Sequence, residues 1–290
     1  MAILVTGSTG TIGSQVLSFL DPSKAELRAL TRSPDSATLP AGVTAVKGDL
    51  ADVDGFRAAL EGVSTLFLLG ANVADEATQV LLALNAAREA SVKGIVYLSV
   101  FKAEEFADLP HFASKASVER MIEAYDLPVT VLRPAYFMQN DVRLREALST
   151  YGVYGMPIGN RGISMVDIRD IGEAAAKELM RREAADRPLP REAYDLVGPD
   201  ALTADGLATL WSDLLGRQIV YGGDDLTAFE NNVKSVAPAW YVYDLKLMMR
   251  RYQLQGAVAD NADVERMGKL LGHAPRAYRD FAKEAAASWK

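Results

Sequence analysis

Short apolar runs alternate with amphipathic stretches through the first half of the chain. The apolar runs predict buried β-strands at Ile3–Val5, Leu27–Leu30, Val43–Val46, Thr65–Leu69, Ile95–Leu98 and Val129–Leu132. Between them, apolar residues recur at the spacing of one helical face and predict helices at Thr11–Leu20, Asp52–Leu60, Asp75–Ala90 and Phe112–Ala124. Strands and helices that alternate in this way imply right-handed crossovers. We therefore expect an α/β fold with a doubly wound parallel sheet of the Rossmann type.

The pattern changes after Pro134. The following part is predicted to contain helices at Asn140–Thr150 and Asp170–Arg182, a glycine-rich loop at residues 151–162, a polar linker at residues 183–192 and a strand at Tyr194–Val197, and it is mostly helical from Thr203 onward. We expect residues 1–133 plus 163–198 to form a dinucleotide-binding domain. Residues 134–162 plus 199–290 are expected to form a smaller, mostly helical substrate domain over the carboxyl ends of the strands, where open α/β sheets bind ligands.

Composition excludes several classes of function. Of the 290 residues, 49% are hydrophobic and 24% are charged, which is the balance of a globular chain with a large core. The net charge of −7 argues against a nucleic-acid-binding protein, because neutralising phosphates requires a positive field. The chain has no cysteine and only 2 histidines. We therefore expect no thiol chemistry, no iron–sulfur cluster and no multi-histidine metal site.

The distribution of apolar residues also bears on location and partners. No apolar run reaches the ~18–20 residues that a membrane helix needs. The N-terminal segment Met1–Val5 lacks the basic region of a signal peptide and runs directly into a turn. We expect a soluble, cytoplasmic protein, a monomer or homodimer, whose partner is a small molecule and neither a membrane nor a nucleic acid.

A glycine loop directly follows the first predicted strand and opens the first predicted helix. It reads Thr6-Gly7-Ser8-Thr9-Gly10-Thr11-Ile12-Gly13. In this context Gly7 permits a tight turn, Gly10 leaves room for the backbone to approach a pyrophosphate, and Gly13 lets the helix pack close to the strand. The main-chain N–H groups and the helix dipole would then hold the anion. The alternative is a glycine turn with a structural role only.

The spacing Gly-x-x-Gly-x-x-Gly resembles the loop of the short-chain dehydrogenase/reductase superfamily. The chain is more closely similar to the NmrA-like atypical branch of that superfamily, over most of its length. Besides the loop, the resemblance is carried by Ala29–Arg32, Gly48–Leu50, Val96–Ser99, His111–Glu119, Thr130–Pro134 and Tyr194–Pro199. That branch includes quinone oxidoreductases, triphenylmethane-dye reductases and the NmrA regulators, so the resemblance implies a nicotinamide cofactor and either a reductase or a regulator.

The end of the second predicted strand bears on the choice of cofactor. NAD-binding proteins usually have a carboxylate there, which takes the ribose 2′-hydroxyl. This chain has Thr31-Arg32-Ser33 instead, and a guanidinium suits a 2′-phosphate, so we predict NADPH (NADP). The alternative is that Arg32 is a solvated surface charge. The resemblance implies that Asp49 contacts the adenine amino group, although a turn-capping role after Gly48 is the alternative.

The resemblance also places the end of the fourth strand, Gly70 and Ala71, beside the nicotinamide ribose. Ser99 occupies the position of the superfamily's serine after the fifth strand, where it either contacts the substrate or only ends the strand. Together the expected cofactor contacts are Gly7, Ser8, Thr9, Gly10, Thr11, Ile12, Gly13, Arg32, Asp49, Leu50, Leu69, Gly70, Ser99 and Lys115.

The catalytic stretch departs from the usual pattern of the superfamily, Tyr-x-x-x-Lys on one helical face. The matching stretch is His111–Lys115, in which the lysine is kept and histidine replaces tyrosine. Resemblance implies that Lys115 holds the nicotinamide ribose, with a helix-surface lysine as the alternative. An imidazole changes its charge near neutral pH, so His111 is either a proton donor or an unremarkable polar residue after Pro110. His273 lies in a loop and is expected to be structural.

The candidate substrate contacts are mostly aromatic: Phe101, Tyr136, Phe137, Asn140 and Trp240. Such residues stack on flat aromatic molecules, although core packing is the alternative for each. We expect an NADPH-dependent oxidoreductase that transfers hydride to a quinone or to a similar electrophilic aromatic of the azo or triarylmethane dye type. A quinone accepts hydride readily, which makes the loss of the tyrosine tolerable. The alternative is a non-catalytic NADP(H)-sensing regulator of the NmrA type that binds a protein partner; an isomerase or dehydratase with tightly held NADP is a third possibility that no residue specifically favours.

Overall fold

The computed structural model describes residues 2–289, and within them seven strands form one sheet. The strands are β1 (Ala2–Val5), β2 (Glu26–Thr31), β3 (Val43–Lys47), β4 (Val63–Leu68), β5 (Gly94–Leu98), β6 (Val129–Pro134) and β10 (Glu192–Leu196). Their order across the sheet is β10-β6-β5-β4-β1-β2-β3, and β1 to β6 pair in parallel. The predicted doubly wound parallel sheet is confirmed, with the chain reversing direction across the sheet between β1 and β4.

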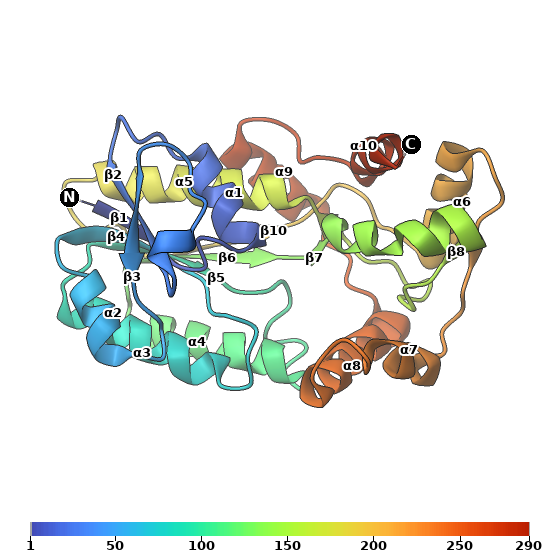
Figure 1. The fold of residues 1–290 in the computed structure, drawn as a ribbon, viewed down its shortest axis with the longest axis horizontal. Coiled ribbons are helices and arrows are strands. Elements are labelled where there is room, and N and C mark those ends of the chain that lie inside the picture. The colour runs from blue at the N-terminus through green and yellow to red at the C-terminus, as the bar shows by residue number, and fades with distance from the viewer. Residues whose placement is uncertain (1, 290) are drawn as a thin grey trace. The chain divides into compact units, whose positions relative to one another are not determined.

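Helices cover both faces of this sheet (Figure 1). One face carries α1 (Thr11–Phe19) and α5 (Ile168–Ala184), which pack against each other; the other carries α2 (Val53–Ala59), α3 (Glu76–Glu89) and α4 (Pro110–Ala124). Every residue of β1, β4 and β5 is buried, because a central parallel strand has no face in water. This explains why these strands read as continuous apolar runs and not as alternating patterns.

The chain divides into two compact units. The first runs through Ala107 and includes His111–Pro134 and Ile168–Asp195. The second comprises Asp108–Pro110, Ala135–Asp167 and the chain from Leu196 onward. Residues 163–167 and 196–198 belong to the second unit because of their pairing: Val166 joins a short ladder there, and the Val197 N–H lies 3.0 Å from the sulfur of Met267.

The second unit is mostly helical. Its helices are α6 (Ala204–Leu215), α7 (Leu226–Val233), α8 (Ala239–Gln255), α9 (Asn261–Leu271) and α10 (Tyr278–Ser288). Its strands are two residues long, and they pair as β7 (Tyr136–Phe137) with β9 (Met165–Val166) and β8 (Val153–Tyr154) with β11 (Val220–Tyr221). The sequence pattern did not predict these four strands, and β8 lies inside the stretch expected to be loop.

The helix predicted at Asn140–Thr150 is present in a different form. A 3₁₀ helix covers Met138–Leu144, and a π-helical turn covers Ala147–Tyr151 before Gly152 ends it in the left-handed conformation, with φ of +68°. The buried residues of the first segment, Met138 and Asp141, are three positions apart. This spacing places both side chains on one side of a 3₁₀ helix, which has three residues per turn.

A buried polar cluster anchors the second unit. The Asp141 carboxylate accepts hydrogen bonds from the hydroxyls of Tyr278 (2.6 Å) and Tyr154 (3.0 Å). The indole N–H of Trp211 donates to the Tyr278 hydroxyl at 3.0 Å, and the Trp211 ring stacks on Trp289 at 5.0 Å. Burial raises the pKa of Asp141 to about 6, although the two phenol hydrogen bonds oppose that shift.

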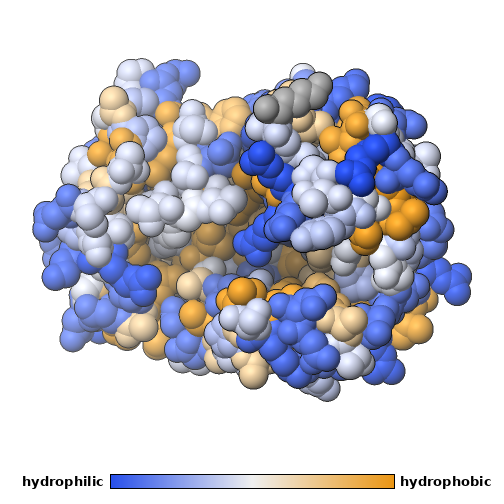
Figure 2. All heavy atoms as spheres, turned by 45° about the vertical axis from the view of Figure 1, so that its right-hand side comes forward, coloured by the Kyte–Doolittle hydropathy of each residue, from blue (hydrophilic) through white to orange (hydrophobic). Residues whose placement is uncertain are grey.

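Within residues 2–289, no helix is both long and apolar enough to cross a bilayer. The face drawn in Figure 2 shows apolar residues in small groups among hydrophilic ones. Exposed apolar side chains distributed in this way are ordinary for a protein surface in water.

Candidate functional site

The glycine loop joins β1 to α1 in the first unit. Gly7 has φ of +60°, in the left-handed region that favours glycine. A Cβ on Gly13 would lie 2.2 Å from the carbonyl oxygen of Gly7, so no side chain fits at that position. The start of α1 therefore packs directly on the loop.

Two hydroxyl groups attach the loop to neighbouring strands. The Thr6 hydroxyl donates to the carbonyl of Leu69 at 3.0 Å and accepts from the Leu69 N–H at 2.8 Å. The buried Ser8 hydroxyl donates to the carbonyl of Leu30 at 2.8 Å. Because the Ser8 hydroxyl is used inside the protein, Ser8 can serve a ligand only through its main chain.

The N-terminus of α1 has the properties of an anion site. Gly10 caps the helix without a side-chain hydrogen bond, and the first turn contains no acidic residue. Thr9, Gly10 and Thr11 are exposed. The positive end of the helix dipole is therefore neither neutralised nor covered by the protein's own side chains, and a pyrophosphate fits its donors.

Arg32 and Asp49 lie beyond the carboxyl ends of β2 and β3, which are neighbours in the sheet. Arg32 is exposed, and no carboxylate occurs in Thr31–Ser33. One carboxylate oxygen of Asp49 accepts the Ala51 N–H at 2.9 Å, so the predicted turn role of Asp49 is present. This bond uses one of the two carboxylate oxygens and is compatible with an adenine contact by the other.

Lys115 lies on α4 and is largely buried, with 13% of its side chain exposed. Its ammonium group donates to Oε1 of Glu76 at 2.8 Å and to the carbonyl of Leu98, the last residue of β5, at 3.4 Å. Glu76 is 5% exposed and begins α3. The alternative of an ordinary surface lysine is therefore wrong: Lys115 is held at the carboxyl end of the central strands.

His111 lies one helical turn before Lys115 on α4 and is partly buried. Its imidazole packs edge-on against Phe112, with 4.5 Å between the ring centroids. The spacing of four residues places both side chains on one face of the helix, as the sequence predicted.

Ser99 is buried, and its hydroxyl donates to the carboxylate of Glu119. Glu119 also accepts from Nε of Arg133 at 3.0 Å, and Arg133 lies 3.9 Å from Asp195. Ser99 thus belongs to a chain of polar contacts that runs through the buried Glu119 of α4 to the partly exposed Arg133 and Asp195. Of its two predicted roles, that of ending the strand is the one that these contacts support.

Tyr97, the tyrosine of the first unit that lies near Lys115, is not an accessible acid. The Tyr97 ring is buried, 6.0 Å from the Lys115 ammonium, and burial together with Glu76 and Glu119 raises its pKa well above the usual value. Tyr136 belongs to the second unit, where burial again raises the pKa well above the usual value.

Sequence reasoning missed both glutamates at this site. Glu119 follows Lys115 by four residues, so helical spacing alone could have placed it on the same face. Glu76 had a weaker signal, as an acidic residue at the start of the helix that follows β4.

The predicted substrate residues fall in different elements. Tyr136, Phe137 and Asn140 lie close together in the second unit, where Asn140 hydrogen-bonds the Tyr136 hydroxyl. Trp240 lies in the first turn of α8 and is 38% exposed. Phe101 is buried in the first unit, which supports core packing for that residue.

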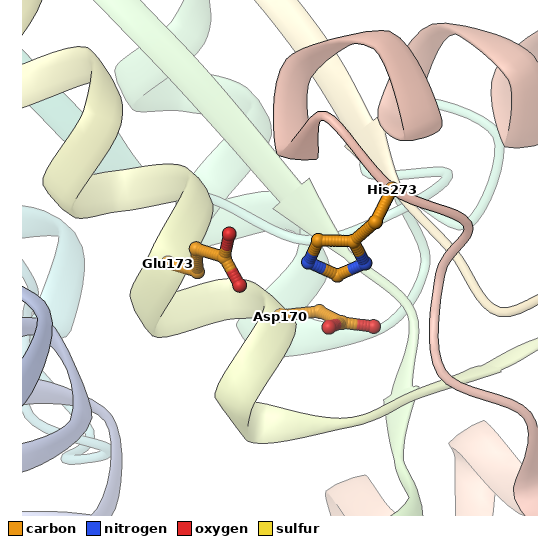
Figure 3. Close-up of side chains that lie close together, drawn as sticks. All are labelled: Asp170, Glu173 and His273. Atoms are coloured by element: carbon orange, nitrogen blue, oxygen red, sulfur yellow. The ribbon is translucent and has the colours of Figure 1, made fainter.

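His273 and two acidic residues of α5 are drawn in Figure 3. His273 follows α9, and its Nδ1 lies 2.8 Å from the carbonyl oxygen of Ala274, a contact within its own turn. Asp170 and Glu173 extend from successive turns at the start of α5. The contact of His273 agrees with the structural role expected for it.

A parallel sheet in this strand order, with a glycine loop between its first strand and first helix, defines an α/β protein of the Rossmann type. The profile of the NmrA-like family matches residues 1–281, so the chain belongs to the NmrA-like family.

Relatives with assigned functions match over nearly their whole length. The chain is 28% identical to an NAD(P)H azoreductase of Xenophilus azovorans over 289 residues, which are 99% of each protein. It is 28% identical to quinone oxidoreductase 2 of Escherichia coli over 276 residues, which are 93% of this chain and 94% of that protein.

Solved structures support the same fold. The NADPH complex of the Escherichia coli NADPH-dependent quinone oxidoreductase superposes with a TM-score of 0.83 at 25% identity, covering 97% of this chain and 99% of that chain. The triphenylmethane reductase of Citrobacter sp. in complex with NADP(H) has a TM-score of 0.84 at 24% identity, covering 98% of this chain and 100% of that chain, and it is similar in fold.

Proposed function

We propose that this protein is an NADPH-dependent oxidoreductase that transfers hydride to a quinone or to a similar electrophilic aromatic, such as an azo or triarylmethane dye. The observation that carries the proposal is the buried Lys115 ammonium at the carboxyl end of β5, in the same unit as the uncapped glycine loop. The similarity to an NAD(P)H azoreductase and to a quinone oxidoreductase supports the same reaction class.

The residues of the first unit fit a bound NADPH from one end to the other. The exposed N-terminus of α1 would hold the pyrophosphate, and Arg32 would hold the 2′-phosphate. Asp49 would contact the adenine, and Lys115 would donate to the ribose hydroxyls next to the nicotinamide. When bound, the cofactor supplies the hydride; the protein supplies position and electrostatics.

The protein has one candidate proton donor on the same helical face as Lys115. With a quinone, His111 would protonate the oxyanion that hydride transfer leaves on the acceptor, and water is the alternative donor. A quinone or an electrophilic dye needs little more than this, because such an acceptor takes hydride without a phenol that activates it. This chemistry and the aromatic side chains of the second unit support that substrate class.

Turnover is the test of the proposal. Purified protein is mixed with NADPH, or with NADH, and a panel of benzoquinones and naphthoquinones, and the near-ultraviolet absorbance of the reduced nicotinamide is followed. We expect fast consumption of NADPH and slow consumption of NADH. Tight NADPH binding with no consumption by any acceptor would overturn the proposal and favour an NADP(H)-sensing regulator.

Lys115→Ala gives this test a variant that addresses the site directly. We expect kcat/KM for NADPH to fall by about tenfold or more, since a buried charge-assisted hydrogen bond contributes roughly 1.5–3 kcal/mol. Lys24→Ala is the control, because Lys24 is exposed and pairs with Asp21 on the surface. Wild-type kinetics for Lys115→Ala would remove Lys115 from the site.

A further inference from the structure

We propose that Glu76 is the positioning residue of this site: its carboxylate holds the Lys115 ammonium where it meets the nicotinamide ribose. The inference rests on the proposed function. It assigns a role to a residue that no motif of the sequence marks, on a helix that carries none of the expected site residues.

The contact between the two residues is short and shielded from water. Lys115 Nζ lies 2.8 Å from Glu76 Oε1, and the two side chains are 13% and 5% exposed. Among the described residues 2–289, Glu76 is the carboxylate with which Lys115 forms an ion pair. The second acceptor of the Lys115 ammonium is the Leu98 carbonyl, which is more distant at 3.4 Å. The carboxylate therefore determines where the ammonium lies.

A buried ion pair of this kind is a poor means of stabilising a fold. Removing two charges from water costs several kcal/mol per ion, and apolar residues of similar volume often replace such a pair without loss of stability. An ion pair at the ligand-binding edge of a sheet is better explained if the carboxylate orients the ammonium toward a ligand. An ammonium has three donors, and Glu76 and Leu98 use two of them, which leaves a donor for a ribose hydroxyl.

Glu76 is itself held firmly. It lies in the first turn of α3, where the helix dipole favours a negative charge. A Cβ on Gly70 would lie 3.0 Å from Glu76 Cγ and 2.6 Å from Val80 Cγ2, so the glycine at the end of β4 provides the space that Glu76 occupies. Gly70 and Lys115, which the sequence assigned separately to the cofactor, are thus linked through Glu76.

The other buried carboxylate on this face is already engaged. Glu119 accepts from the Ser99 hydroxyl and from the Arg133 guanidinium. Among the ion pairs of the described residues, Glu119 pairs with Arg133 and Lys115 pairs with Glu76. Glu76 is therefore the residue whose removal should release Lys115.

The test compares two ligands. NADPH reaches the nicotinamide ribose, whereas 2′,5′-ADP contains only the adenosine half with its 2′-phosphate. Dissociation constants for both are measured by calorimetry for wild type, Glu76→Gln, Lys115→Ala and the double variant. We expect Glu76→Gln to weaken NADPH binding by about tenfold and to leave 2′,5′-ADP within about twofold. In the Lys115→Ala background, Glu76→Gln should have no further effect, because Glu76 acts through the lysine.

A matched control separates positioning from general destabilisation. Glu178 is a buried carboxylate on α5 that accepts from the Thr130 hydroxyl at 2.7 Å, near the start of β6. Glu178→Gln makes the same chemical change away from the cofactor edge, and it should leave the ratio of the two dissociation constants unchanged. If Glu76→Gln does not fold, Glu76→Asp keeps the charge and withdraws the carboxylate by one methylene group; NADPH should again weaken severalfold relative to 2′,5′-ADP.

The outcomes distinguish the two proposals. If the wild type binds NADPH and reduces quinones but Glu76→Gln keeps the wild-type ratio, the role of Glu76 is wrong and the proposed function stands. Equal losses for both ligands, or additive effects in the double variant, would likewise overturn the positioning role. If the wild type does not bind NADPH, the proposed function itself fails.

Discussion

The expected preference for NADPH over NADH depends on one exposed side chain, that of Arg32. Neither neighbour in Thr31–Ser33 carries a charge, and NAD-specific proteins place a carboxylate at this point. A guanidinium can bind a phosphate through two parallel hydrogen bonds but gains little from a neutral hydroxyl. The ratio of the NADPH and NADH dissociation constants should therefore change strongly when Arg32 is removed.

Arg32→Ala should lower the preference for NADPH over NADH. We expect the NADPH dissociation constant to rise by about tenfold or more and that of NADH to change by less than about threefold, in line with ~1.5–3 kcal/mol for a charged hydrogen bond. Arg57→Ala is the control, since Arg57 is an exposed arginine that pairs with Glu89 on α2 and α3. An unchanged ratio of the two constants would show that Arg32 is only a surface charge.

Asp141 shows a second effect of a single residue: its burial makes the free energy of unfolding depend on pH. Burial raises its pKa to about 6, from 3.8 for the ordinary side chain. The folded state therefore binds a proton more tightly than the unfolded state. The stabilisation from that proton is fully present below about pH 4 and is lost as the pH rises through about 6, a change of roughly 3 kcal/mol.

The difference in unfolding free energy between wild type and Asp141→Asn should therefore fall between pH 4 and pH 7, by about 2–3 kcal/mol. The three tryptophans at positions 211, 240 and 289 all lie in the second unit, so tryptophan fluorescence during urea unfolding reports that unit. Asp213→Asn, an exposed substitution in the same unit, is the control. A difference for Asp141→Asn that does not change with pH would contradict the shifted pKa.

At the scale of elements, the connection from β1 to α1 combines folding and binding in one short segment. Gly13 is required by packing, because its Cβ would meet the Gly7 carbonyl at 2.2 Å. Gly10 is less crowded, with 3.2 Å to the same oxygen, and it lies on the exposed side of the loop. The two glycines should therefore respond differently to the same substitution.

Gly13→Ala should destabilise the first unit by about 1–3 kcal/mol, as overpacking does, and should abolish NADPH binding as well. Gly10→Ala should keep most of the stability and still weaken NADPH binding by about tenfold, because its methyl group occupies space beside the pyrophosphate. Thermal unfolding followed by circular dichroism, with calorimetric titration of NADPH, separates the two cases. Equal losses of stability in both variants would contradict this division of roles.

At the scale of the whole molecule, the predictable parts are those whose signal is local. The strands β1 to β6 and the helices between them were predicted within a few residues, because each strand gives a local apolar run and each helix is long enough to show its own period. The two-residue strands were not, since two residues have no period and their pairing joins distant segments, such as Tyr136 with Met165. The 3₁₀ helix at Met138–Leu144 was predicted only as helix, because its form depends on where Asp141 is buried.

The site divides in the same way. The glycine loop, Arg32 and Lys115 carry spacing or type signals that can be recognised along the chain. The pair between Glu76 and Lys115 joins two helices and exists only once β4 and β5 lie side by side. Sequence alone also left two roles open for Ser99, contacting the substrate or only ending the strand. The hydrogen bond to Glu119, which favours the second role, forms only in the folded chain.

The order in which the parts of the first unit leave the ribosome has a consequence for its biogenesis. The glycine loop, Arg32, Glu76 and Lys115 are all synthesised before β6 ends at Pro134. The helix that covers α1 and the strand that pairs with β6 come only with Ile168–Asp195, after an intervening segment of the second unit. At ~5–20 residues per second, the nascent sheet keeps one face only partly covered and one edge open for several seconds. Chaperones that shield apolar surface should therefore meet this chain during that interval, when its cofactor residues are already made but its sheet is not yet closed.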